Sequence, residues 1–227
     1  MQSLGIGLGI SLARRTGGGA AAPSVSLTDS GVDNSDLSVY TFSNKTLGNG
    51  NIVIAGVVRA GTAITISSLT VAGNAATVDV TSTNGATSSA FIAHVVNTAS
   101  TGDVVLTLSG AAARAGIAVF RINNYTQAAP YLTGNAIRAA SAGTMSPDLT
   151  GAISTGVVIG VAFNGLGPGH RIAAGSQLVG AKTNHAITVD VQAGVTTWPV
   201  GLNAGIDTEM EVTGTAVSMA SASAAFK

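Results

Sequence analysis

Three histidines, His94, His170 and His185, are the side chains that could most readily transfer a proton or bind a metal near neutral pH. None stands at metal-ligand spacing from another histidine, or from a carboxylate on the same element. His94 lies inside the run from Phe91 to Val95, which predicts a partly buried strand residue. His170 follows Gly165-Leu-Gly-Pro-Gly and is expected in a solvated loop. Because the chain also has no cysteine, we predict no metal site.

The carboxylates form two local groups. Asp29, Asp33 and Asp36 crowd an oxygen-rich segment of the kind that can hold calcium, although its spacing is not that of an EF-hand. An ordinary polar loop with Asx turns is the simpler interpretation, and a bound calcium ion stays open as the alternative. Glu209 and Glu211 share one face of a predicted strand. That face is the wet one, whereas glycoside hydrolysis needs two acids that face one cleft.

The glycine-rich segments and the serines do not complete a known catalytic motif. The segment from Gly165 to His170 lacks the Lys-Ser/Thr pair of a phosphate-binding loop, and no predicted helix follows it. Gly5-x-Gly-x-Gly9 lacks the preceding strand and the βαβ unit of a dinucleotide site. Neither Gly-x-Ser-x-Gly nor His-Glu-x-x-His occurs. We therefore predict that the chain has no catalytic residues, is not an enzyme and binds no cofactor.

Carbohydrate recognition usually stacks sugars on aromatic rings, and aromatic residues make up only 4% of this chain. Trp198 is the single tryptophan. Packing in the core or at its rim is the simpler role for it. A shallow glycan contact formed by Trp198 and His170 is the alternative.

Residues 1–23 form a unit of their own. Five apolar side chains alternate with Gly or Ser up to residue 11, so one side of an extended chain is apolar and the other nearly bare. Each glycine disfavours a helix by ~1 kcal/mol, whereas an extended segment can lie as a strand against another protein. The triple glycine Gly17–Gly19 suggests a flexible joint. We predict a docking arm that comprises Leu4, Ile6, Leu8, Ile10, Leu12, Arg14 and Arg15.

Residues 24–227 are predicted to form an all-β body, an antiparallel β-sandwich of jelly-roll type. Val78 and Val80 alternate with Thr77, Asp79 and Thr81, which predicts a strand with one wet face, as do residues 187–192 and 209–213. The runs 52–58 and 157–163 are apolar on both faces and predict buried central strands. Gly and Asn mark turns between strands spaced about 8–12 residues apart, as in a sandwich or barrel.

Composition narrows the set of partners. The formal net charge is zero and no basic patch is visible, so nucleic-acid binding is not expected. No segment reaches the ~18 apolar residues of a membrane span, and Arg14-Arg15 follow the first apolar stretch, whereas a signal peptide has its charges before it. Hydrophobic residues make up 46% and charged residues only 9%. Such a neutral surface fits a protein inside an assembly and fits a weakly charged secreted domain equally well.

The arm, Ser3-Leu-Gly-Ile-Gly-Leu-Gly-Ile-Ser-Leu-Ala-Arg-Arg15, resembles the Leu/Gly-rich N-termini of tailed-bacteriophage virion proteins. In the body, the segments 66–77, 101–110 and 114–121 are similar to phage structural domains of jelly-roll type. The resemblance implies a virion component, assembled in the host cytoplasm, which the arm anchors to the head or tail. Its expected partners are capsid or tail proteins and symmetric copies of itself. The alternative is a fibre module that binds a host surface glycan.

Overall fold

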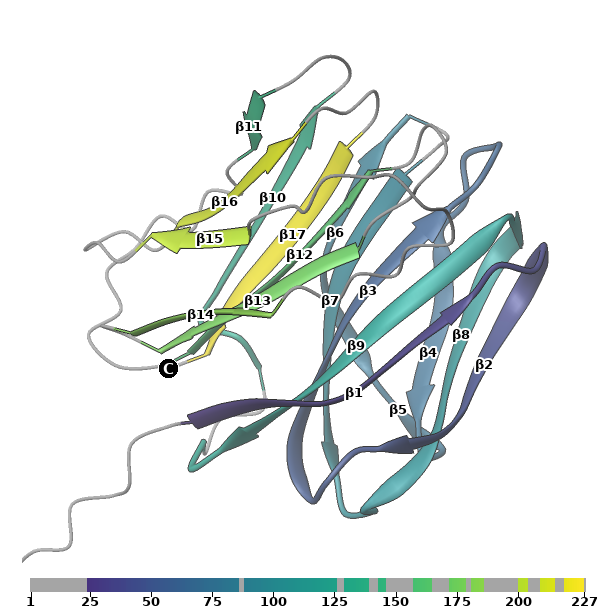
Figure 1. Cartoon of the computed structure of the whole chain (residues 1–227). Helices are drawn as coiled ribbons and strands as arrows, with labels where there is room; N and C mark the ends of the chain where they lie inside the picture. The colour runs from purple at the N-terminus through teal and green to yellow at the C-terminus, as the bar shows by residue number, and fades with distance from the viewer. Residues whose placement is uncertain are drawn as a thin grey trace, which may run out of the picture.

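The structure is a computed structural model that describes residues 24–85, 88–125, 129–138, 143–145, 157–164, 172–178, 181–185, 200–203, 209–214 and 219–226. These residues contain strands, turns and bends but no helix, and every strand pairing is antiparallel. The sheets pack face to face (Figure 1). The prediction of an all-β, antiparallel sandwich is confirmed.

A five-stranded central sheet organises the molecule. Its strand order is β1 (Ser24–Asp33), β9 (Arg114–Asn123), β3 (Gly50–Arg59), β7 (Ser88–Asn97) and β6 (Thr77–Asn84). On one face lies the N-terminal outer sheet, with the order β2 (Leu37–Thr46), β8 (Thr101–Ala112), β4 (Ile66–Val71) and β5 (Asn74–Ala75). The core between these two sheets, called here the first core, contains buried side chains such as Tyr40, Ile54, Phe91, Leu106 and Ile117.

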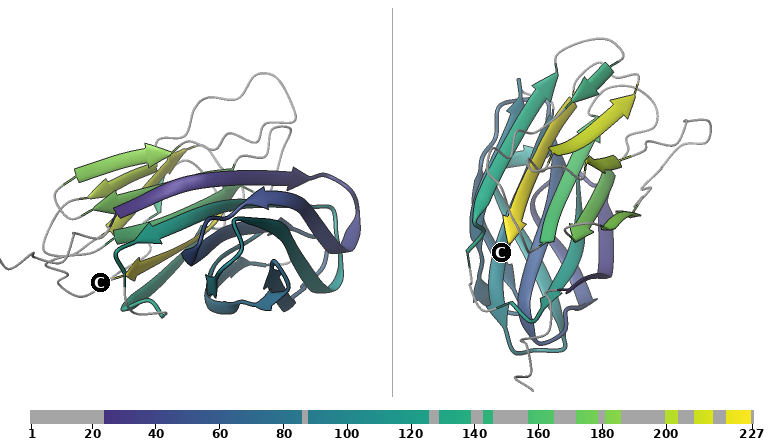
Figure 2. Two further views of the ribbon diagram at one scale, coloured as in Figure 1. Left: turned by 90° about the horizontal axis from the view of Figure 1, so that it is seen from below. Right: turned by 90° about the vertical axis from the view of Figure 1, so that its left-hand side faces the viewer.

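The opposite face of the central sheet carries a third layer (Figures 1 and 2). This C-terminal outer sheet has the order β10 (Leu132–Arg138), β17 (Met219–Phe226), β12 (Val157–Asn164), β13 (Ile172–Leu178) and β14 (Ala181–His185). The second core, between this sheet and the central sheet, includes Ala55, Ile92, Phe120, Ile159 and Phe226. A small sheet of β11 (Gly143–Met145), β16 (Glu209–Gly214) and β15 (Val200–Asn203) accompanies it.

Strand β3 is buried on both faces because it runs through the middle of the central layer. Ile52, Ile54 and Val58 pack in the first core, and the intervening Val53, Ala55 and Val57 pack in the second. Residues 157–161 of β12 are buried without exception. The prediction that these two apolar runs form central strands is therefore confirmed for the residues whose side chains the structure describes.

Strand β6 departs from the predicted alternation. Its pairing with β7 shifts register between Val78 and Val80, which marks a β-bulge. As a result Val78 packs against the first core and Val80 against the second. The expectation that both valines share one apolar face is wrong, because the extra residue at the bulge inverts the alternation that follows it.

Candidate functional site

Two of the sites predicted from the sequence, the docking arm and the candidate glycan contact, lie outside the described residues. This applies to the docking-arm residues Leu4, Ile6, Leu8, Ile10, Leu12, Arg14 and Arg15, and to the candidate glycan contacts Trp198 and His170. All of them stay predictions. The described body begins at Ser24, the first residue of β1, which is an edge strand of the central sheet. The predicted arm therefore leads directly into a sheet edge.

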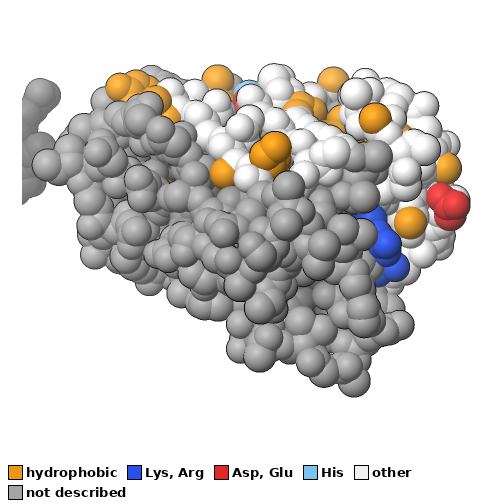
Figure 3. Space-filling model, turned by 90° about the horizontal axis from the view of Figure 1, so that it is seen from above, with side chains coloured by type: hydrophobic (Ala, Val, Ile, Leu, Met, Phe, Trp, Pro, Cys, Tyr) orange, Lys and Arg blue, Asp and Glu red, His pale blue; other side chains and the backbone are white. Residues whose placement is uncertain are grey.

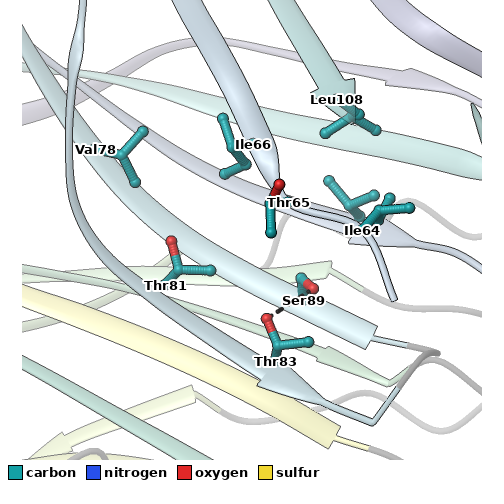
Figure 4. A pocket seen from close by; sticks show the side chains of 9 residues that line it. Ile64, Thr65, Ile66, Val78, Thr81, Thr83, Ser89 and Leu108 are labelled. Atoms are coloured by element: carbon teal, nitrogen blue, oxygen red, sulfur yellow. Dashed lines mark hydrogen bonds between the residues drawn. The ribbon is translucent and has the colours of Figure 1, made fainter. Parts of the chain in front are cut away.

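A cavity of about 210 Å³ opens between the central and N-terminal outer sheets (Figure 4). Aliphatic side chains form most of its wall, and four hydroxyl-bearing side chains complete it. The lining residues are Val58, Ile64, Thr65, Ile66, Val78, Thr81, Thr83, Ser89 and Leu108. The hydroxyls of Thr83 and Ser89 point toward each other and form a hydrogen bond of 3.1 Å.

The bulge in β6 gives this cavity its polar lining. Because the register shifts after Val78, Thr81 and Thr83 face the same side as Val78. A regular strand would instead point Val80 and Ser82 into the cavity. No lining residue titrates near neutral pH, so the wall can pack against apolar groups and form hydrogen bonds but offers no general acid or base. Its volume is below the roughly 300–1,000 Å³ of pockets that enclose drug-sized ligands.

His94 is paired with Asp79 at the same bulge. Its Nδ1 lies 2.7 Å from Oδ1 and 2.8 Å from Oδ2 of the carboxylate. The two side chains are only 12% and 6% exposed, respectively. His94 is thus a partly buried strand residue, as predicted, but the expectation that Asp79 lies on a wet face is wrong. Within the described part of the chain, no group of three His, Asp or Glu side chains is arranged to hold a metal ion.

The acidic segment around β1 has structural partners. The Asp29 carboxylate accepts hydrogen bonds from the backbone N–H groups of Ser30 and Thr46, at 2.7 and 2.8 Å, and lies 3.3 Å from Lys45 Nζ. Burial alone would raise the pKa of Asp29, but these hydrogen bonds and the lysine charge outweigh it and lower the pKa. Asp33 Oδ1 accepts from Ser35 N–H at 2.8 Å, which is the predicted Asx turn. The prediction of a loop is wrong for Asp29, which lies inside strand β1 and is paired with Val119 of β9.

Tyr40 is buried at the end of the first core that lies next to the loop after β1. Its side chain is fully buried, and its hydroxyl donates to the backbone carbonyls of Ser35, at 2.9 Å, and of Ala112. Burial raises the pKa of Tyr40, and the negative charges of Asp33 and Asp36 add to that rise. The phenol therefore joins the loop after β1 to the end of β8, in its protonated form.

The substitution Tyr40→Phe should lower the free energy of unfolding by about 1–3 kcal/mol, because it removes the hydrogen-bond donor from the buried carbonyl of Ala112 and from the partly buried carbonyl of Ser35. The raised pKa of Tyr40 also sets the direction in which stability depends on pH. The folded state holds the phenolic proton more tightly than the unfolded state, so Tyr40 favours folding below pH 10 and this contribution is lost as the pH rises further. Urea titrations between pH 8 and 11 should show a shallower alkaline decline for Tyr40→Phe. Parallel declines in the two proteins would contradict this role.

Comparison with known proteins identifies no relative of this chain. No protein-family model, no curated protein and no solved structure matches the chain. In the described residues, no helix is long and apolar enough to span a membrane.

Proposed function

We propose that this chain is a structural component of a phage particle, a head decoration, head spike or tail-fibre-like protein, which its N-terminal arm anchors to other virion proteins. One observation carries the proposal. In the sequence, apolar residues alternate with Gly or Ser from Leu4 to Leu12, and Gly17–Gly19 follow before Ser24, the first residue of an edge strand. An extended segment of this kind binds by adding to or lying across a neighbouring β-structure.

The connectivity of residues 24–123 supports the proposal. Only Ala76 separates β5 from β6, so we count the two as one bent strand that passes between sheets. Numbered in this way, the eight strands of this segment follow the order 1-8-3-6-5 in the central sheet and 2-7-4-5 in the N-terminal outer sheet. We infer jelly-roll connectivity from this interleaving. Jelly rolls are common in viral capsid and lectin domains, and this support is an analogy of fold.

The surface is consistent with a place inside an assembly. Figure 3 shows a face whose described side chains are mostly apolar or uncharged, with few charged groups among them. On β2, Leu37 and Val39 are 38% and 45% exposed, and Val96 of β7 is 57% exposed. Small uncharged side chains lose little conformational entropy when a neighbouring protein covers them, so repeated copies can pack closely.

Deletion of residues 2–19 tests the proposal. The truncated chain should fold with the same circular dichroism spectrum and thermal midpoint as the full chain, because both cores lie within the body. We expect it to be absent from particles assembled in a host that supplies it in place of the full chain. Quantitative mass spectrometry of purified particles measures the copy number. Incorporation of the truncated chain at the normal copy number would rule out anchoring by the arm.

A further inference from the structure

The cavity between the central and N-terminal outer sheets has two chemically different sides (Figure 4). From the outer sheet, Ile66 of β4 and Leu108 of β8 contribute aliphatic side chains. Three of the four lining hydroxyls, those of Thr81, Thr83 and Ser89, come from β6 and β7 of the central sheet. A molecule inside the cavity would therefore contact methyl groups on one side and hydroxyls on the other.

The cavity can be reached from solvent. The lining residues Thr81 and Thr83 are exposed and Ile66 is half-buried, so these side chains form its rim. Val58 and Leu108 are buried members of the first core and form its floor. A ligand that enters past the exposed rim thus meets an apolar surface that is already withdrawn from water.

The hydroxyl pair of Thr83 and Ser89 retains hydrogen-bonding capacity. Each hydroxyl carries one O–H donor and two acceptor lone pairs, and their mutual hydrogen bond of 3.1 Å uses one donor and one lone pair. The pair can therefore donate one further hydrogen bond and accept others. Because Ser89 is itself buried, a hydrogen bond formed beside it is shielded from competing water.

We propose that the cavity binds a small, neutral, aliphatic molecule that carries one hydroxyl or carbonyl group. A protein cavity of about 150 Å³ holds benzene, so 210 Å³ accommodates about eight non-hydrogen atoms. No lining residue is charged, so a charged ligand would lose its hydration without compensation. The lining also offers no aromatic ring on which a sugar could stack. The inference is independent of the proposed function, because it uses only residues of the described body.

Titration of the purified full chain with 1-hexanol, followed by methyl NMR, tests the site. We expect saturable shifts with a Kd of about 1 mM or lower, because the hexyl chain leaves water for an apolar floor. The shifts should include the methyl signals of Val58 and Leu108 and spare those of Ile159 in the second core. Hexanoate, which has a hydrocarbon chain of similar length and a charge, should bind at least ~10-fold more weakly. Absence of saturation, or equal affinity for hexanoate, would overturn the proposal.

The substitution Thr83→Val tests the hydroxyl pair, because valine keeps the shape of threonine and lacks its hydroxyl. The affinity for 1-hexanol should fall by ~3–10-fold, as expected for the loss of one hydrogen bond. Thr77→Val is the matched control. Thr77 is an exposed residue of the same strand that does not line the cavity, and its substitution should leave the affinity within ~2-fold. Equal affinities of these two variants would contradict hydrogen bonding by the pair.

The substitution Thr65→Phe tests the location of the site by filling the cavity. Thr65 lines the cavity and is exposed, so a larger side chain can enter it from the rim without displacing the first core. We expect this variant to keep the circular dichroism spectrum of the full chain and to lose saturable binding of 1-hexanol. Thr62→Phe, at an exposed position of the same connecting segment outside the lining, should bind as the full chain does. Equal saturable binding by the two variants would place the alcohol elsewhere and overturn the proposal.

Discussion

The substitution Gly56→Ala should destabilise the protein by about 1–3 kcal/mol, although it adds a single methyl group. Gly56 lies in the middle of β3 and is paired with Phe91 of β7. A methyl group at this position would come within 2.8 Å of the ring atom Cε2 and closer still to Cζ and Cε1. Phe91 is fully buried in the first core, so its ring cannot move aside without displacing its neighbours.

The control for this variant is Gly61→Ala. Gly61 is exposed, and a methyl group there would meet no atom within 4 Å. We expect its free energy of unfolding to stay within about 0.5 kcal/mol of the parent in urea titrations. In the double variant Gly56→Ala/Phe91→Leu, the smaller side chain makes room for the methyl group. The loss of unfolding free energy in the double variant should therefore be smaller than the sum of the losses in the two single variants. Equal stability of Gly56→Ala and Gly61→Ala would contradict the packing of the ring on the glycine.

The substitution Phe226→Ala should lower the free energy of unfolding by about 3–5 kcal/mol, as for other buried phenylalanines. Phe226 lies on β17, the strand that pairs with both β10 and β12, and its side chain is 1% exposed in the second core. Its ring and that of Tyr125 form a T-shaped pair with a centroid distance of 5.7 Å and an interplanar angle of 84°. The loss should weaken the attachment of the C-terminal outer sheet to the central one.

The matched variant on the same sheet is Ile137→Ala. Ile137 is 58% exposed on β10, so its replacement by alanine should change the free energy of unfolding by no more than about 0.5 kcal/mol. If the third layer detaches from the central sheet before the first core unfolds, Phe226→Ala should also bind a hydrophobic fluorescent dye at urea concentrations at which Ile137→Ala does not bind it. Similar unfolding midpoints for the two variants would show that β17 does not hold the second core together.

Local patterns predicted the strands better than their arrangement. The apolar run 52–58 indicated burial on both faces because period-two alternation is absent there, and β3 confirms it. The third layer could not be predicted, because the pairing of β17 with β10 and β12 joins segments distant in the chain. The bulge at Val78–Val80 left no signature in the residue types, so the alternation placed Val80 on the same face as Val78, which is wrong.

The side-chain constellations depend on register in the same way. Asp79 and His94 are fifteen residues apart, and their contact requires both the hairpin from β6 to β7 and its bulge. Thr83 and Ser89 are brought together only by the pairing of β6 with β7. Neither pair has a spacing that single-strand periodicity could reveal. The Asx turn at Asp33 could be predicted, because its hydrogen bond reaches only two residues along the chain.

Anchoring by the arm is tested most directly by comparing its two sides in the intact chain. Ile6→Ser/Leu8→Ser removes two apolar side chains that alternate with glycine, and Gly5→Ser/Gly7→Ser adds the same polar groups to the other side. Burial of two such side chains is worth about 3 kcal/mol or more, so the first variant should bind at least ~100-fold more weakly. We expect particles to lack the first variant and to carry the second at the parental copy number. Equal copy numbers of both variants on purified particles would contradict attachment through the apolar side of the arm.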